Sequence, residues 1–206
     1  MLQKDINKEE TLNEIAEIAK THKYKIKGCY LFGSQVYSTA SEGSDTDVIL
    51  VANSPSPEVE IKNDKFNVHI IVPDVFLKNA KDNHIKSIEC LFAPEWAKIK
   101  DFQTDFKYKP DSFRHNISHT VSNSWVKCKK KLAQGDYYIG VKSIFHSIRI
   151  ADFGIQFAKT HKIDFGSTNW MWDEIKAKEW TWDELDEKYK PIRNSKLTEF
   201  RKLASL

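Results

Sequence analysis

The segment from Leu31 to Leu50 constrains the fold of this chain more than any other part of its sequence. Just before it, Tyr24–Phe32 is rich in β-branched and aromatic residues, which predicts a strand that ends at Gly33. Later, Val48–Ala52 is a continuous apolar run, which predicts a buried strand directly after an Asp-Thr-Asp triplet. The first half of the chain is therefore expected to build a small mixed sheet around this segment.

Gly33 and Ser34, at the end of the first predicted strand, have the chemistry of a phosphate-binding turn. Glycine lets the backbone come close to a ligand, and the following amides and the Ser34 hydroxyl can donate to phosphate oxygens. A helix that began here would add its positive dipole end. We predict a triphosphate-binding loop at Gly33 and Ser34, with Ser44 as a further nucleotide-binding residue.

Asp45 and Asp47 lie two residues apart at the start of the second predicted strand. Because side chains alternate along a strand, both carboxylates should project to the same side of the sheet. Two like charges held so close require a cation, and Mg²⁺ commonly binds carboxylates together with phosphate oxygens. The pair therefore predicts a magnesium site that activates a hydroxyl and stabilises a leaving pyrophosphate.

The complete pattern is a strand, a Gly-Ser pair, ten residues, and Asp-x-Asp running into Val-Ile-Leu-Val. It resembles the motif of nucleotidyltransferases of the DNA polymerase β superfamily. The resemblance implies an α+β core in which Gly33 and Ser34 hold a nucleoside triphosphate. It also implies that Asp45 and Asp47 hold Mg²⁺, or Mn²⁺, while a nucleoside monophosphate passes to an acceptor hydroxyl.

The resemblance extends along most of the chain. The segments 66–72 and 88–94 look like those of predicted nucleotidyltransferases related to the RNA-repair-associated polymerase β type proteins. Lys142, His146 and Arg149 match a Lys-x-x-x-His-x-x-Arg helix of that group, and one helix face would bring them together at a phosphate. The alternative is that Lys142 and Arg149 are solvated while His146 is packed in the core.

The chain departs from the superfamily pattern at Asn67, where a third carboxylate normally binds metal and helps to deprotonate the hydroxyl. An amide carbonyl can still bind a metal, but it cannot accept that proton, so catalysis should be slower. Three explanations remain open: natural degeneracy, an introduced replacement of aspartate, or another residue that fills the role. Candidates for that residue are Asp64, His69 and Glu89.

A second departure is Ser38, where many relatives carry glycine. Such a change could alter the phosphate-binding loop, because glycine accepts backbone conformations that other residues disfavour.

The remaining elements follow from periodicity and turn residues. The first half should contain a helix over Lys8–Lys20, a hairpin made of Val59–Ile61 and Phe66–Val72, and one or two helices over Asp74–Ala93. Pro94–Pro110 is the expected domain boundary. Beyond it we predict four helices: Asp111–Leu132, Tyr137–Lys159, Trp170–Lys178 and Trp182–Tyr189.

The expected architecture is an α+β protein in which a small mixed-sheet nucleotidyltransferase core with flanking helices, residues 1–100, precedes a C-terminal helical bundle, residues 101–206. The charged start of the chain lacks the apolar region of a signal peptide, and no apolar run is long enough to span a membrane. We therefore expect a cytoplasmic protein. Three widely separated cysteines match no zinc-ligand spacing, so buried reduced thiols are expected.

The acceptor is the least determined part of the prediction. Between Lys107 and Lys162 the sequence has eleven Lys and Arg residues against three Asp. This charge fits a solvated helix face and a phosphate-binding surface equally well, and the second interpretation makes a nucleic acid the expected acceptor. One rival is a catalytically impaired relative that binds nucleotide or RNA. Another is a transferase that modifies a partner protein, as in an antitoxin-like pair. The sequence does not indicate an oligomeric state.

Overall fold

The structure, a computed structural model, describes residues 7–54 and 56–204. The chain divides into two compact units, Met1–Lys107 and Tyr108–Leu206. Every strand in the described part of the chain belongs to the first unit, and the second unit is built from helices.

The first unit contains a mixed five-stranded sheet with the strand order β3-β4-β2-β1-β5. β2 and β4 run parallel, and the other neighbouring pairs are antiparallel. The predicted hairpin is confirmed, since β3 and β4 pair across the Asn63-Asp64 turn. The strands are β1 (Ile26–Phe32), β2 (Thr46–Ala52), β3 (Glu58–Lys62), β4 (Phe66–Ile71) and β5 (Lys98–Lys100).

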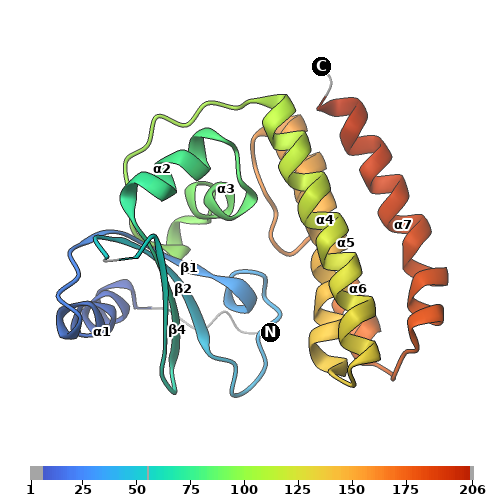
Figure 1. Ribbon diagram of the computed structural model, residues 1–206, viewed down its shortest axis with the longest axis horizontal. Helices are drawn as coiled ribbons and strands as arrows, with labels where there is room; N and C mark the ends of the chain where they lie inside the picture. Colours follow the sequence, from blue (N-terminus) through green and yellow to red (C-terminus); the bar gives the residue numbers. More distant parts are fainter. Residues whose placement is uncertain (1–6, 55, 205–206) are drawn as a thin grey trace. The chain divides into compact units, whose positions relative to one another are not determined.

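Helices cover both faces of this sheet. On one face, Tyr30 and Ile49 pack with Phe76 and Cys90 of the helices that follow β4. The alternate strand residues, Leu31 among them, are also buried, so the other face is covered too. Figure 1 shows α1 on one side of the strands and α2 and α3 on the other. The α-helices are α1 (Lys8–Thr21), α2 (Pro73–Lys81) and α3 (Ile85–Leu91). The α+β fold class is therefore confirmed.

The first unit continues further than its apolar pattern suggests. Within the segment predicted as a boundary, a 3₁₀-helix at Glu95–Ala97 (η2) leads into β5, which pairs with β1. Lys98–Lys100 is short and carries two lysines, so it has no strand-like hydrophobic pattern. Such composition is usual for an edge strand, where charge discourages pairing with other chains.

Within residues 108–204 the second unit has four helices: α4 (Pro110–Ala133), α5 (Tyr137–Thr160), α6 (Asn169–Lys176) and α7 (Trp182–Leu203). None of the helices in the described ranges is long and apolar enough to cross a membrane. The prediction that α7 ends at Tyr189 is wrong, because the helix continues through Pro191. Its later turns bury Leu197 and Phe200, and the Phe200 ring lies 5.5 Å from that of Phe113. This burial offsets the hydrogen bond that proline removes.

The cysteines and most of the tryptophans belong to the interior. Cys29, Cys90 and Cys128 are buried and free, as predicted. Burial raises the pKa of Cys29 and of Cys128 to about 12, so these thiols remain protonated. Trp172 lies in the core of the helical unit, Trp180 and Trp182 pack against that core, and Trp170 is 52% exposed.

Candidate functional site

The candidate site is a row of side chains at one end of the sheet. Asp47 near the start of β2 is paired with Phe32 at the end of β1 and with Asn67 near the start of β4. Asn67 is in turn the partner of Lys62 at the end of β3. Since partners in register project from the same face, Asp47, Asn67 and Lys62 form one row across three strands.

The Asp47 carboxylate joins the Gly33 turn to Asn67. A Cβ placed on Gly33 would lie 2.1 Å from Oδ2 of Asp47, and Gly33 has a φ of +70°. The Nδ2 of Asn67 donates a hydrogen bond of 3.2 Å to Oδ1 of the same carboxylate. Glycine is therefore needed at residue 33 both for its backbone angle and for the space that Asp47 fills.

The turn after β1 is a 3₁₀-helix at Gly33–Gln35 (η1), so the longer helix considered from the sequence is not formed here. The amides of Val36 and Tyr37 donate back to the carbonyl of Gly33 at 3.1 Å. A turn this short contributes little dipole, so any affinity for an anion would come from the shape of the backbone. The Ser34 hydroxyl has no hydrogen-bond partner within the described residues.

Two other serines shape the loop between Gly33 and Asp45. The Oγ of Ser44 accepts a hydrogen bond of 2.9 Å from the backbone amide of Ser41, and the two hydroxyls are 3.1 Å apart. The structure therefore gives Ser44 a role in closing this loop. Ser38 has a φ of +56°, a region that favours glycine, so the loop keeps a glycine-like backbone with a serine side chain.

Asp45 forms an ion pair with Lys62, a residue outside the predicted site. Its Oδ2 lies 3.0 Å from Nζ of Lys62, and the two side chains are 35% and 67% exposed. The hydrogen bond that Lys62 donates to this carboxylate raises the pKa of Lys62 above its ordinary value. The predicted hairpin could have indicated that Lys62 lies near the site, because pairing across the Asn63-Asp64 turn puts Lys62 opposite Asn67.

Asn67 supplies an oxygen that suits a hard cation. Its Oδ1 is buried without a hydrogen-bond partner among the described residues, while its Nδ2 contacts Asp47 and lies 3.3 Å from Nε2 of His69. Together with the carboxylates of Asp45 and Asp47, this carbonyl oxygen makes an all-oxygen donor set. Such a set fits Mg²⁺ or Mn²⁺ better than a softer metal.

The three candidates for a replacement carboxylate or base differ in their surroundings. Asp64 is exposed in the β3–β4 turn. Glu89 is buried in α3 and accepts a hydrogen bond of 2.9 Å from the hydroxyl of Tyr37. His69 is the one that contacts Asn67. Over residues 7–54 and 56–204, no three His, Cys, Asp or Glu side chains gather closely enough to hold a metal, so none of them completes a three-carboxylate site with Asp45 and Asp47.

Tyr37→Phe is expected to lower the free energy of unfolding by about 1 to 3 kcal/mol, because the buried Glu89 carboxylate loses a donor. Tyr37 directly follows the Gly33 turn, so this bond also fastens that turn to α3. Urea denaturation measures the effect. Tyr24→Phe, in the same unit, is the matched control and should change stability by less than about 0.5 kcal/mol. Equal effects of the two variants would show that the bond to Glu89 is unimportant.

Lys142, His146 and Arg149 all lie on α5, in the second unit, and only two of them contact each other. The Nη2 of Arg149 lies 2.7 Å from Nδ1 of His146, and Arg149 is only 5% exposed. The Arg149 guanidinium also lies over the rings of Phe145 and Phe153. Lys142 is exposed. A role for these three residues in triphosphate binding stays a prediction.

His146→Asn is expected to reduce the loss of stability on mild acidification. Burial, and after it the charge of Arg149, lowers the pKa of His146 to about 3. The unfolded chain, with a histidine pKa of about 6.5, therefore binds the extra proton first, and stability falls as the pH drops from about 6.5 towards 3. One proton limits this slope to about 1.4 kcal/mol per pH unit. Denaturation at several pH values measures it; His115→Asn, an exposed control, should keep the natural slope.

Comparisons with known proteins identify the family of this chain. The family model of the nucleotidyltransferase domain matches residues 12–118, just over half of the 206 residues. The crystal structure of a nucleotidyltransferase-like protein from Exiguobacterium sibiricum 255-15 is similar at 9% identity and a TM-score of 0.30, over 96% of this chain and 74% of that one. No curated protein matched. The family match includes Gly33, Ser34, Ser44, Asp45, Asp47 and Asn67 and ends before Lys142.

Proposed function

The chain belongs to the nucleotidyltransferase domain family, and from that premise we propose that it is a Mg²⁺-dependent enzyme that moves a nucleoside monophosphate from a nucleoside or deoxynucleoside triphosphate to an acceptor hydroxyl. The observation that carries the proposal is the position of Asp47. Its carboxylate lies against the Gly33 turn on one side and against Asn67 on the other. The proposed metal ligand and the proposed phosphate-binding turn are thus adjacent, as nucleotidyl transfer requires.

Each residue of the site has a proposed task. The amides of the Gly33 turn and the Ser34 hydroxyl bind and orient the triphosphate through hydrogen bonds to its oxygens. Asp45, Asp47 and the Oδ1 of Asn67 would hold the metal. When bound, the metal supplies positive charge that lowers the pKa of the acceptor hydroxyl and stabilises the leaving pyrophosphate. Ser44 keeps the connecting loop closed through Ser41.

Asn67 favours a second candidate function, a relative that binds nucleotide with little turnover. The amide of Asn67 donates to Asp47 and has no basic atom that could take the proton of the attacking hydroxyl. His69, two residues further along β4, is a base beside this position, since its Nε2 lies 3.3 Å from Nδ2 of Asn67. We propose that transfer by the natural chain is slow and that any proton acceptor here is His69 or solvent.

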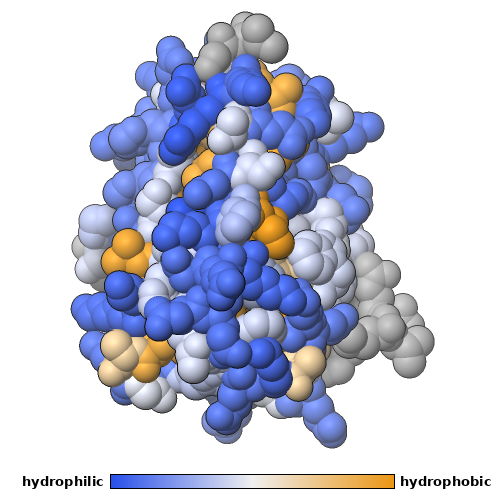
Figure 2. All heavy atoms as spheres, turned by 90° about the vertical axis from the view of Figure 1, so that its right-hand side faces the viewer, coloured by the Kyte–Doolittle hydropathy of each residue, from blue (hydrophilic) through white to orange (hydrophobic). Residues whose placement is uncertain are grey.

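We propose a nucleic acid as the acceptor, with a protein hydroxyl as the alternative. The support is the exposed basic side chains of α4, which include Lys127, Lys129 and Lys130. Figure 2 shows a largely hydrophilic face of the helical unit on which hydrophobic residues are scattered rather than gathered. This face therefore offers no broad apolar protein interface, and the support for a phosphate backbone is the charge of the lysines.

We further propose that residues 1–100 form the transferase core, that residues 101–206 form a helical domain with the basic residues, and that the enzyme works in the cytoplasm. Lys142, His146 and Arg149 are proposed as triphosphate contacts from this domain. Of the three, Lys142 is the exposed one, so we expect it to contribute most.

The test of the proposed function is a screen for label transfer from each of the common nucleoside and deoxynucleoside triphosphates labelled at the α-phosphate, with Mg²⁺ and with RNA, DNA and protein acceptors. We expect label on an oligonucleotide, and we expect oligonucleotide binding to weaken as salt rises. Label on a co-purified protein instead would favour the protein acceptor. Metal-dependent triphosphate binding without any transfer, even by Asn67→Asp, would favour the binding-only candidate.

A further inference from the structure

Lys62 supplies a positive charge at the position where the site lacks a negative one. It is the register partner of Asn67, on the neighbouring strand of the hairpin. Its Nζ lies 3.0 Å from Oδ2 of Asp45. The lysine side chain therefore reaches from the Asn67 side of the row to a proposed metal ligand.

The charges of Asp45, Asp47 and Lys62 argue against two divalent ions. A paired-metal site places its ions about 3.5 to 4 Å apart, and shared carboxylates must offset their mutual repulsion. Here Asp45 and Asp47 are opposed by Lys62, and the neutral Asn67 stands at the third position. The three charged side chains carry a formal net charge of −1. Three carboxylates without a lysine would carry −3, so these side chains attract a second divalent ion less strongly than such a site would.

The hydrogen bonds of the Asp45 and Asp47 carboxylates also favour a single divalent ion. Asp45 has a nitrogen partner in Lys62, and Asp47 has one in the Nδ2 of Asn67. Both partners come from the β3–β4 hairpin, on the same side of Asp47. The β3–β4 hairpin therefore already provides nitrogen partners for the carboxylates of Asp45 and Asp47. It does so on the side of Asp47 where a third carboxylate would bind a second ion.

We propose that Lys62 takes the place of the second cation, so that the site holds one divalent ion, at Asp45 and Asp47, and not two. The inference rests on the proposed function. The ammonium group has three donors, and it lies where it can contact oxygens of the triphosphate or of the acceptor while the divalent ion is bound by the aspartates. Lys62 is 67% exposed, so its side chain is free to move from Asp45 to such an oxygen.

A Mn²⁺ titration followed by electron paramagnetic resonance tests this inference without an activity measurement. We expect the natural chain to bind one Mn²⁺ per chain, with binding abolished by Asp45→Ala. Lys62→Met should tighten that single site by about tenfold, because a positive charge beside a ligand is removed. The double variant Lys62→Met with Asn67→Asp should bind two ions and show the signal of a spin-coupled pair.

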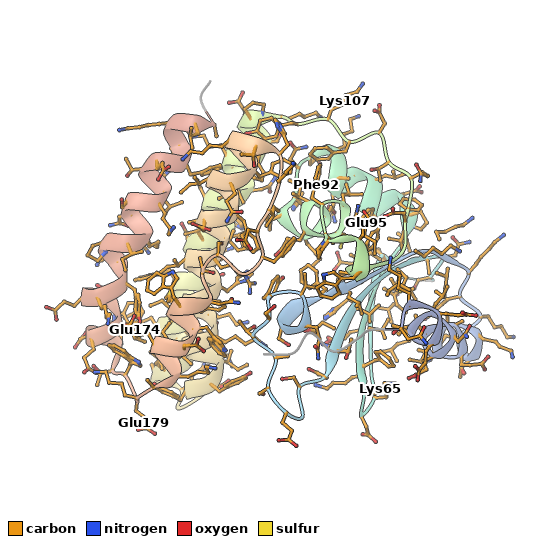
Figure 3. All side chains as sticks on the ribbon, turned by 180° about the vertical axis from the view of Figure 1, so that it is seen from behind. Lys65, Phe92, Glu95, Lys107, Glu174 and Glu179 are labelled. Carbon is orange, nitrogen blue, oxygen red and sulfur yellow. The ribbon has the colours of Figure 1, made fainter. Side chains whose placement is uncertain are left out.

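Lys65→Met is the matched control, since it removes the same charge from the same hairpin. Figure 3 shows Lys65 at the β3–β4 turn, where it pairs with Glu14 and lines a pocket of about 470 Å³ beside α1. Its Mn²⁺ affinity should stay within about twofold of the natural value, since an exposed charge with its own partner is well screened.

Three results would overturn the inference: two ions in the natural chain, an unchanged affinity in Lys62→Met, or a single ion in the double variant. In each of these cases, the proposed function is not contradicted as long as Asp45→Ala abolishes Mn²⁺ binding. By contrast, a natural chain and an Asn67→Asp variant that neither bind Mn²⁺ nor transfer a nucleotide would contradict the proposed function itself.

Discussion

Replacing Asn67 with aspartate is expected to raise the rate of nucleotidyl transfer by about a hundredfold, within the range that a positioned general base contributes. The new carboxylate would lie beside Asp47, where the amide now donates at 3.2 Å. It could take the proton that Asn67 cannot accept. The effect should appear in kcat measured with Mg²⁺ and a saturating triphosphate, because proton removal belongs to the chemical step.

Asn63→Asp is the matched control for this variant. Asn63 lies in the turn just before β4, and its Oδ1 accepts hydrogen bonds from the amides of Lys65 and Phe66. Aspartate preserves that acceptor and adds the same negative charge outside the row. A rise in kcat of similar size in both variants would attribute the effect to net charge and not to a base at residue 67.

Gly33→Ala is expected to lower transfer by about a hundredfold or more, the size of loss that a misplacement of about 1 Å can cause at a reacting centre. Its Cβ would lie 2.1 Å from Oδ2 of Asp47, so the carboxylate must leave the turn or the turn must open. Either movement separates the metal ligand from the phosphate-binding amides. Activity and urea denaturation should be measured together, because the variant also strains the backbone.

Gly43→Ala separates the two causes of this effect. Gly43 also has a positive φ, +83°, but a Cβ there would meet nothing within 4 Å. Gly43→Ala should therefore lower the free energy of unfolding only by the cost of a positive φ, about 1 to 2 kcal/mol, and leave the Asp47 carboxylate in place. If Gly33→Ala and Gly43→Ala reduce transfer equally, the contact between Gly33 and Asp47 has no special role.

The elements that the sequence predicted well are those with strong local patterns. Val48–Ala52 is apolar throughout, and the strand there begins two residues earlier, at Thr46. The long periodic segments of α4 and α5 were predicted to within about two residues. Lys98–Lys100 and the second half of α7 were missed, because pairing with β1 and burial of Phe200 are distant contacts that no local pattern contains.

The same division applies to the site. Gly33, Ser34, Asp45 and Asp47 could be named from a motif, because short spacings around a turn reflect local chemistry. The contact between Gly33 and Asp47 depends on the register of β1 with β2, and the ion pair of Asp45 with Lys62 depends on the β3–β4 hairpin. These are distances across strands, and they become visible only when the sheet is assembled.

The most direct test of the account follows the α- and γ-phosphates separately. Triphosphates labelled at one or the other are incubated with Mg²⁺, acceptor and the Asn67→Asp chain, with and without Asp47→Asn. For nucleotidyl transfer at this site we expect that the α-label joins the acceptor, that the γ-label leaves as pyrophosphate, and that Asp47→Asn abolishes both events. Transfer of the γ-label to the acceptor, or transfer that survives Asp47→Asn, would contradict it.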